Sequence, residues 1–152
     1  MRRLVTYIAL FIVTVFLNGC SKSNNSAGPV VITASVNGTQ WGASVTNVTF
    51  NKTPTLHITI HAVSGSTSMN FDLNPYTGIG IYPITSSNGA YYAVDNGSSG
   101  VVYNQANSGQ VEITDTYSDG GTRTFIKGKF NFSTDNNITV TNGLFTVYLE
   151  LN

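Results

Sequence analysis

The 152-residue chain has one cysteine, Cys20, and few charged residues, with seven basic and seven acidic side chains. A single cysteine excludes an intramolecular disulfide. The basic residues form no stripe that could follow a line of phosphates, so we expect no nucleic-acid partner. After Cys20, apolar residues do not recur at helical spacing over three turns, which argues against a helical domain.

The sequence also has no hydrophobic run as long as a transmembrane helix. Its one candidate is the uncharged segment from Leu4 to Leu17. A transmembrane helix needs about 20 apolar residues, so this segment is too short to span a bilayer comfortably. Two arginines precede it, and Gly19 and Cys20 follow. This layout predicts a bacterial lipoprotein signal peptide over residues 1–19, in which Leu17 and Gly19 guide the signal peptidase and Cys20 becomes the lipidated residue.

Lipidation at Cys20 would attach acyl chains, palmitate among them, and hold the protein at a lipid bilayer. A lipidated cysteine of this kind carries three acyl chains. Each methylene buried in the bilayer contributes about 0.8 kcal/mol to membrane binding, so three chains anchor a protein in effect permanently. Ser21 stands where an aspartate would favour the inner membrane, which favours the outer membrane instead. Residues 20–29 form a polar tether without an acidic cluster, and this favours the periplasmic leaflet over the cell surface.

Residues 30–152 are predicted to form one domain, because 133 mature residues suffice for a single core. Without its signal the chain has five basic and seven acidic residues, a formal charge of −2. Short stretches of alternating apolar and polar residues are separated by turn signals every 8–12 residues. The pattern predicts an all-β fold, either an antiparallel β-sandwich or a flattened meander barrel, of about ten short strands.

Two local features specify this fold further. Asn37-Gly38 predicts a two-residue hairpin turn that places Ala34 opposite Trp41, with the indole facing the core. Near the C-terminus the apolar positions change from even (Ile138, Val140) to odd (Phe145 onwards). One extra residue near Asn142-Gly143 would restore a common face, so we expect a bulge or tight turn there.

Several short sequence segments, or phrases, resemble those of the small uncharacterised lipoprotein families that are abundant in Bacteroidota. Such families are known mainly as domains of unknown function, so the resemblance implies a β fold and an envelope location and carries over no catalytic residues. The phrases are Ala34 to Trp41 (ASVNGTQW), Gly80 to Ile84 (GIYPI), Gly109 to Thr114 (GQVEIT), Gly128 to Phe132 (GKFNF) and Thr141 to Phe145 (TNGLF).

His57 and His61 are the only histidines of the chain. On a strand they would lie about 13 Å apart at ~3.3 Å per residue, too far to share one metal ion. We therefore expect two outward-facing side chains between buried neighbours. The sequence predicts no metal site, no cofactor and no catalytic residues.

Tyrosines gather in the less regular segments, together with asparagine and serine, a composition typical of adaptable recognition surfaces. Candidate binding loops are residues 74–78, 86–108 and 115–122, with Tyr76, Tyr103 and Tyr117 as their aromatic contacts. Tyr82 and one member of the Tyr91–Tyr92 pair are expected to fill the edge of the core instead.

These observations predict a membrane-anchored envelope lipoprotein with a non-enzymatic binding or structural β domain. A glycan or an envelope protein is the expected partner besides the bilayer. One alternative is a glycan-active hydrolase, which would need two inward carboxylates from Asp72, Asp95, Glu112 and Asp115. The other is a lipocalin-like carrier of a small apolar ligand, which would need a cavity in place of a packed core.

Overall fold

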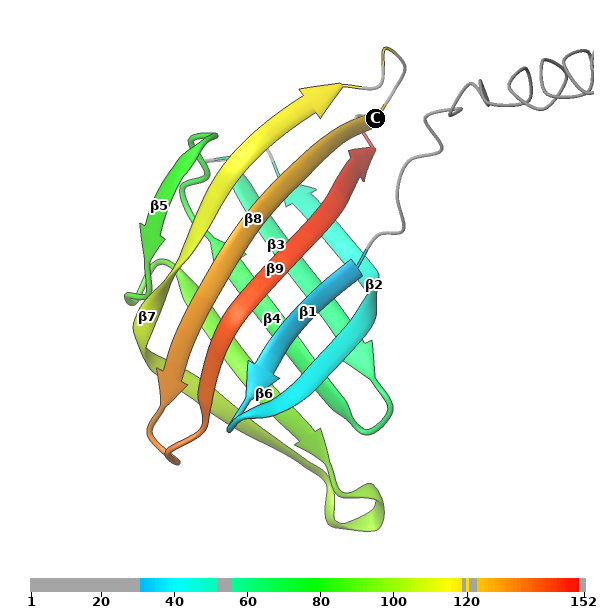
Figure 1. Ribbon diagram of the computed structural model, residues 1–152, viewed down its shortest axis with the longest axis vertical. Helices are drawn as coiled ribbons and strands as arrows, with labels where there is room; N and C mark the ends of the chain where they lie inside the picture. The colour runs from blue at the N-terminus through cyan, green and yellow to red at the C-terminus, as the bar shows by residue number, and fades with distance from the viewer. Residues whose placement is uncertain (1–30, 52–55, 119, 121–122, 151–152) are drawn as a thin grey trace, which may run out of the picture.

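The computed structural model describes residues 31–51, 56–118, 120 and 123–150, and the chain is all-β there apart from one short 3₁₀ turn (Figure 1). The predicted signal, Cys20 and the tether lie outside these residues. The all-β prediction is confirmed, with nine strands. They are β1 (Val31–Val36), β2 (Thr39–Asn51), β3 (His57–Ser64), β4 (Thr67–Leu73), β5 (Gly80–Pro83), β6 (Gly89–Asp95), β7 (Val101–Ser118), β8 (Arg123–Thr134) and β9 (Thr139–Glu150).

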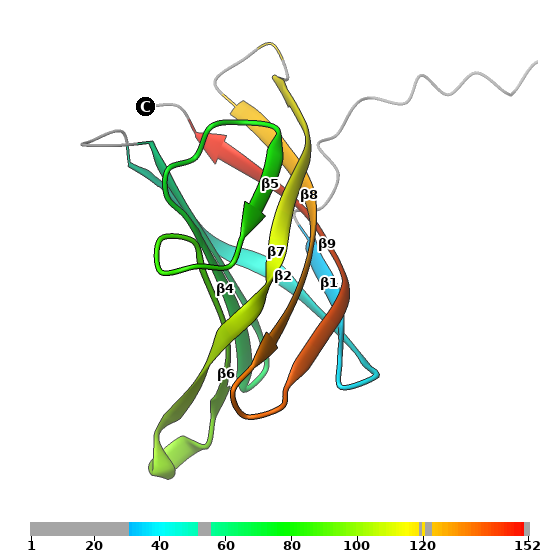
Figure 2. The same cartoon turned by 90° about the vertical axis from the view of Figure 1, so that its left-hand side faces the viewer.

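The strands form one curled antiparallel sheet. Neighbours in the chain pair with one another from β1 to β4, then β4 pairs with β6, β6 with β7, β7 with β8, β8 with β9, and β9 with β1. These pairings return to the first strand, so the sheet closes as a flattened barrel (Figures 1 and 2). The short strand β5 lies outside this ring and pairs with β7 alone.

Strand β7 is where the sequence prediction differs most from the structure. The sequence pattern predicts only short strands, whereas residues 101–118 form one strand of 18 residues. Its first part pairs with β6 and its second part with both β5 and β8. Extra residues near Asn107 and Thr114 interrupt the pairing with β8, and such bulges bend a strand enough to let it change neighbours.

The Asn37-Gly38 hairpin is confirmed in its register. Ala34 lies directly opposite Trp41, and both side chains are buried. Asn37 and Gly38 have φ angles of 49° and 82°, the positive values that a type I′ turn requires. The Trp41 indole donates a hydrogen bond to the Thr67 hydroxyl at 2.8 Å, which satisfies the polar end of a buried ring.

Side chains fill the inside of the barrel. Phe71 is at the centre of an aromatic cluster, with ring centroids 4.4 Å from Phe130, 6.2 Å from Phe132 and 6.4 Å from Phe145. Isoleucines and valines from the other strands surround these rings. The core therefore draws on both halves of the chain.

Two glycines allow aromatic rings to reach across from β8 to β9 and back. Gly128 lies opposite Phe145, and Gly143 lies opposite Phe130. A Cβ atom on either glycine would collide with the facing ring, and one on Gly128 would also meet the carbonyl oxygen of Glu112. The two rings thus occupy the space that side chains at these positions would need.

The predicted bulge in the last strand is confirmed. Phe130 pairs with Gly143 and Phe132 with Val140, so β9 has one residue more than β8 over this stretch. The register with β1 shifts at the same place. Asn142 has a φ of 53°, a left-handed conformation that asparagine tolerates better than most residues. The extra residue keeps Val140 on the same buried face as the later apolar residues.

Candidate functional site

The three tyrosines predicted to bind a ligand occupy different environments. Tyr76 is only 8% exposed and stacks on Tyr82, with ring centroids 6.0 Å apart and planes 12° from parallel. Burial, and secondarily the neighbouring Tyr82, raises the pKa of Tyr76 above its ordinary value. Tyr103 and Tyr117 are 56% and 38% exposed. Tyr76 is thus a core residue, while the other two remain available at the surface.

The predicted binding loops do not meet at one place. Residues 86–108 are mostly strand, because β6 and the first part of β7 fill this range, so that loop prediction is wrong. Successive turns of an antiparallel meander alternate between the two ends of the sheet, so the loop after β4 and the end of β7 lie opposite the β6–β7 hairpin (Figure 1). Tyr103 and Tyr117 are 14 residues apart on β7, about 46 Å of extended strand.

Tyr103 belongs to an exposed group that we call the tyrosine face, made of Tyr91, Tyr103, Asn70 and Gln105. In the outer-face register Tyr91 lies between Asn70 of β4 and Gln105 of β7. The rings of Tyr91 and Tyr103 meet edge to face, with centroids 5.2 Å apart and planes at 84°. Partial burial, and secondarily Tyr103, raises the pKa of Tyr91 above its ordinary value of 10.0.

The two histidines face outward from β3, as expected, and are half-buried. The His57 imidazole is hydrogen-bonded to the Asp72 carboxylate of β4, and the Thr59 hydroxyl lies 3.3 Å from His57 Nε2. Among the described residues, no group of three or more histidine, cysteine, aspartate or glutamate side chains is placed to hold a metal ion. The contact with Asp72 makes His57 part of a cross-strand polar pair.

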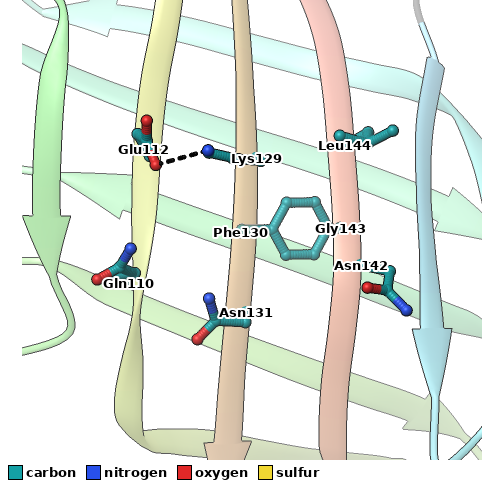
Figure 3. Close-up of a pocket in the computed structure, with 8 residues that line it drawn as sticks. All are labelled: Gln110, Glu112, Lys129, Phe130, Asn131, Asn142, Gly143 and Leu144. Atoms are coloured by element: carbon teal, nitrogen blue, oxygen red, sulfur yellow. Dashed lines mark ion pairs between the residues drawn. The ribbon is translucent and has the colours of Figure 1, made fainter.

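A second exposed region lies on the outer face of β7, β8 and β9, and we call it the amide depression. It is a shallow hollow of about 450 Å³. Figure 3 shows its side chains in two rows that cross the three strands. The upper row is Glu112, Lys129 and Leu144, the lower row is Gln110, Asn131 and Asn142, and Phe130 and Gly143 lie between them.

The backbone of β9 shapes this hollow. The bulge at Asn142 interrupts the regular pleat beside the depression, and the next residue, Gly143, faces inward, where the Phe130 ring covers it. Leu144, 58% exposed, forms an apolar rim. No aromatic or titratable pattern in the sequence points to this site, although the phase break at Asn142-Gly143 marks its position.

The polar groups of the depression differ in how they are satisfied. Lys129 Nζ lies 3.2 Å from a Glu112 carboxylate oxygen, so the two charges offset one another (Figure 3). Within the part of the chain that the structure describes, the side-chain amides of Gln110, Asn131 and Asn142 have no hydrogen-bond partner. The depression therefore combines a neutralised charge pair with three amides that can donate and accept.

Tyr117 lies further along the same outer face, in a row that we call the aromatic ladder. Its ring stacks on Phe125 of β8, with centroids 4.9 Å apart, and Phe125 in turn contacts Tyr148 of β9. Lys127 Nζ lies 4.9 Å from the centre of the Tyr117 ring, a cation–π distance. Tyr117 is thus at the end of the face that carries the depression.

The four carboxylates considered for hydrolysis are distributed over the surface. Asp72 bonds to His57 on β4, and Asp95 caps the β6–β7 turn by accepting from the Gly97 amide at 2.8 Å. Glu112 and Asp115 share the outer face of β7, each opposite a lysine of β8. Of these four, only Glu112 lines the depression.

Among the described residues, no helix is long and apolar enough to cross a membrane. No curated protein and no solved structure matches the chain. A family model described as Domain of unknown function (DUF6252) matches residues 28–147. Because that match covers most of the sequence, including every strand up to the middle of β9, the chain belongs to the DUF6252 family.

Proposed function

We propose that this protein is a lipid-anchored lipoprotein of a bacterial envelope, of the kind found in Bacteroidota, and that its β domain binds a ligand without altering it. The anchor is the lipid on Cys20, in the outer membrane and with the domain in the periplasm. The binding surface is the amide depression. The observation that carries the proposal is the set of three amides around that hollow that have no partner among the described residues.

Unpartnered polar groups in a hollow favour a binding role, because a ligand that pairs with them replaces bound water by direct hydrogen bonds. The surrounding backbone supports such a role. In this stretch β7 pairs with β5 and β8, and β9 pairs with β8 and β1. Strands paired on both sides hold the backbone under these side chains in place, which lowers the entropy lost on binding.

The position of the depression agrees with a membrane-proximal ligand. Thr33 of β1 lies opposite Leu144, so the chain enters the domain close to the rim of the hollow. Residues 21–30 span at most about 35 Å when fully extended. A ligand at the depression would therefore be drawn from envelope material close to the anchoring bilayer.

The two alternative functions have less support. A carrier of apolar ligands needs an internal cavity, whereas the described core residues pack together inside the barrel around Phe71. A glycosidase needs two carboxyl groups on either side of the scissile bond. Glu112, beside Lys129, is the one carboxylate among the residues that line the depression.

Site-specific photocrosslinking in intact cells tests the proposal. A benzophenone-bearing phenylalanine analogue would replace Leu144 at the rim of the depression, and in a matched variant it would replace Val101 on the β6–β7 hairpin. Both residues are exposed and apolar. We expect an adduct of increased mass from position 144 and none from position 101.

The same Leu144 variant with Cys20→Ala tests the anchor. Loss of the lipid should release the protein from the membrane fraction and abolish both palmitate incorporation and the adduct. Equal adducts at 144 and 101 would refute the depression as the binding surface. Continued membrane retention of the Cys20→Ala protein would refute the lipid anchor.

A further inference from the structure

We infer that the amide depression takes a neutral, hydroxyl-rich ligand, the chain of a neutral glycan. This inference rests on the proposed binding function and adds the chemical class of the ligand. It follows from three properties of the depression, which are its hydrogen-bonding groups, its charge and the pairing of its strands.

The hydrogen-bonding groups match hydroxyls better than other ligand chemistries. Each amide of Gln110, Asn131 and Asn142 offers donors on nitrogen and an acceptor on oxygen. A sugar hydroxyl also donates and accepts, so it can satisfy both ends of an amide. Leu144, which is 58% exposed, provides an apolar surface against which the C–H face of a sugar ring could lie.

The charge of the depression argues against an anionic ligand. Lys129 is the only basic residue lining it, and Glu112 lies 3.2 Å from the lysine nitrogen. An anion would have to displace that carboxylate or lie beside it. Phosphate and carboxylate ligands are ordinarily held by arginine or lysine groups that have no such competitor.

The strand pairing argues against an extended peptide as the ligand. Peptides commonly bind a sheet by adding a strand to a free edge. At the depression, Gln110 pairs across both neighbours, with Pro83 of β5 and Asn131 of β8, and Leu144 of β9 pairs with Lys129 and Thr33. Recognition here is left to side chains, which suits a ligand whose own polar groups point outward.

Affinity electrophoresis of the mature lipidated protein in detergent tests the inference. The probes are three neutral polysaccharides (dextran, mannan and galactan), polygalacturonate as an anionic one, and gelatin as an unfolded polypeptide. We expect at least one neutral polysaccharide to retard the protein, and neither polygalacturonate nor gelatin to do so.

Variants of the amides then locate the site. Asn142→Gly removes an amide but keeps the left-handed backbone, and Asn131→Ala removes an exposed one. Each single variant should raise the dissociation constant about fivefold, since one hydrogen bond contributes about 1 kcal/mol. The double variant should raise it about 25-fold. The matched control is Gln105→Ala, which removes an amide from the outer face of β7 outside the depression and should leave binding unchanged.

Three results would overturn the inference. These are retardation by polygalacturonate or gelatin alone, retardation by none of the probes, and neutral-glycan binding that survives the amide variants. If the crosslink at position 144 still formed in any of these cases, the binding surface would stand and only the ligand class would be wrong. Loss of that crosslink would refute the proposed function itself.

Discussion

The tyrosine face and the amide depression both lie on the outside of the barrel and share strand β7, yet they are built differently. The tyrosine face is formed by large rings on regular strands, where Tyr91 and Tyr103 meet edge to face. The depression lies beside the bulge at Asn142, where side chains of modest size surround a hollow. The tyrosine face is defined by its residue types, whereas the amide depression is defined by a hollow beside a backbone bulge.

The difference shows why aromatic content is an incomplete guide to binding surfaces. Tyrosines are conspicuous in a sequence, and of the three chosen as contacts one is buried and the other two lie far apart on β7. The amides of the depression are unremarkable among the many asparagines of this chain. Their interest comes from the hollow that they line together, which depends on the pairing of their strands.

The strongest test of this comparison removes the glycine packing that underlies the depression. Gly128→Ala should lower the free energy of unfolding by about 3 kcal/mol, because the new methyl group meets the Phe145 ring and the Glu112 backbone oxygen. Gly42→Ala is the matched control, since a Cβ there makes ordinary contacts, and its effect should stay within about 0.5 kcal/mol. Urea denaturation followed by circular dichroism measures the free energy of unfolding of both variants. Equal losses in the two variants would contradict the packing of Phe145 against Gly128 between β8 and β9.

The second test separates the shape of the bulge from its chemistry. Asn142→Val should cost about 2 kcal/mol of stability, because a β-branched residue is strained at a φ of 53°. Asn142→Gly should leave stability within about 0.5 kcal/mol of the parent protein and still weaken ligand binding. Thermal unfolding measures the stability of the two variants. A stable valine variant would show that the left-handed bulge is not needed.

The smallest expected effect concerns the tyrosine face. Tyr103→Phe should bring the pKa of Tyr91 part of the way back towards 10.0 and leave it raised, because burial is the larger cause and Tyr103 the smaller one. Since the folded protein holds this proton more tightly than the unfolded chain, the associated stability is present below pH 10 and is lost as the pH rises through the folded-state pKa. NMR titration of the Tyr91 ring carbon that bears the hydroxyl measures the shift. Complete return to the ordinary value would mean that the ring contact, and not burial, governs the titration.

Much of the fold could be predicted from local patterns. The register of the Ala34–Trp41 hairpin and the bulge near Asn142 both agree with the structure, because turn chemistry and the two-residue period act over a few neighbours. The continuity of residues 101–118 as one strand could not be predicted. The polar residues in the middle of this strand are held in it by pairing with β6 and β8.

The candidate site was predictable only in its ingredients. Tyr82 at the edge of the core was expected because tyrosine commonly buries its ring and turns its hydroxyl towards water. The burial of Tyr76, in the β4–β5 connection, accompanies its stack on Tyr82 and has no such local signal. Gln110, Asn131 and Asn142 carry no pattern that distinguishes them from other amides. Nothing local to any of them indicates that they would lie together.

By itself the sequence determined the strand-forming segments, the Asn37-Gly38 turn and the extra residue in the last strand, since these depend on side-chain periodicity and on backbone conformations available to single residues. It also determined the expectation of a lipid anchor at Cys20, which depends on a contiguous motif. Only the tertiary structure decided that β7, β8 and β9 run side by side and that the hollow opens where the bulge lies beside Gly143. The reason is physical, since a concave site needs the relative positions of residues about ten to thirty places apart in the chain, and these are fixed by strand pairing and core packing.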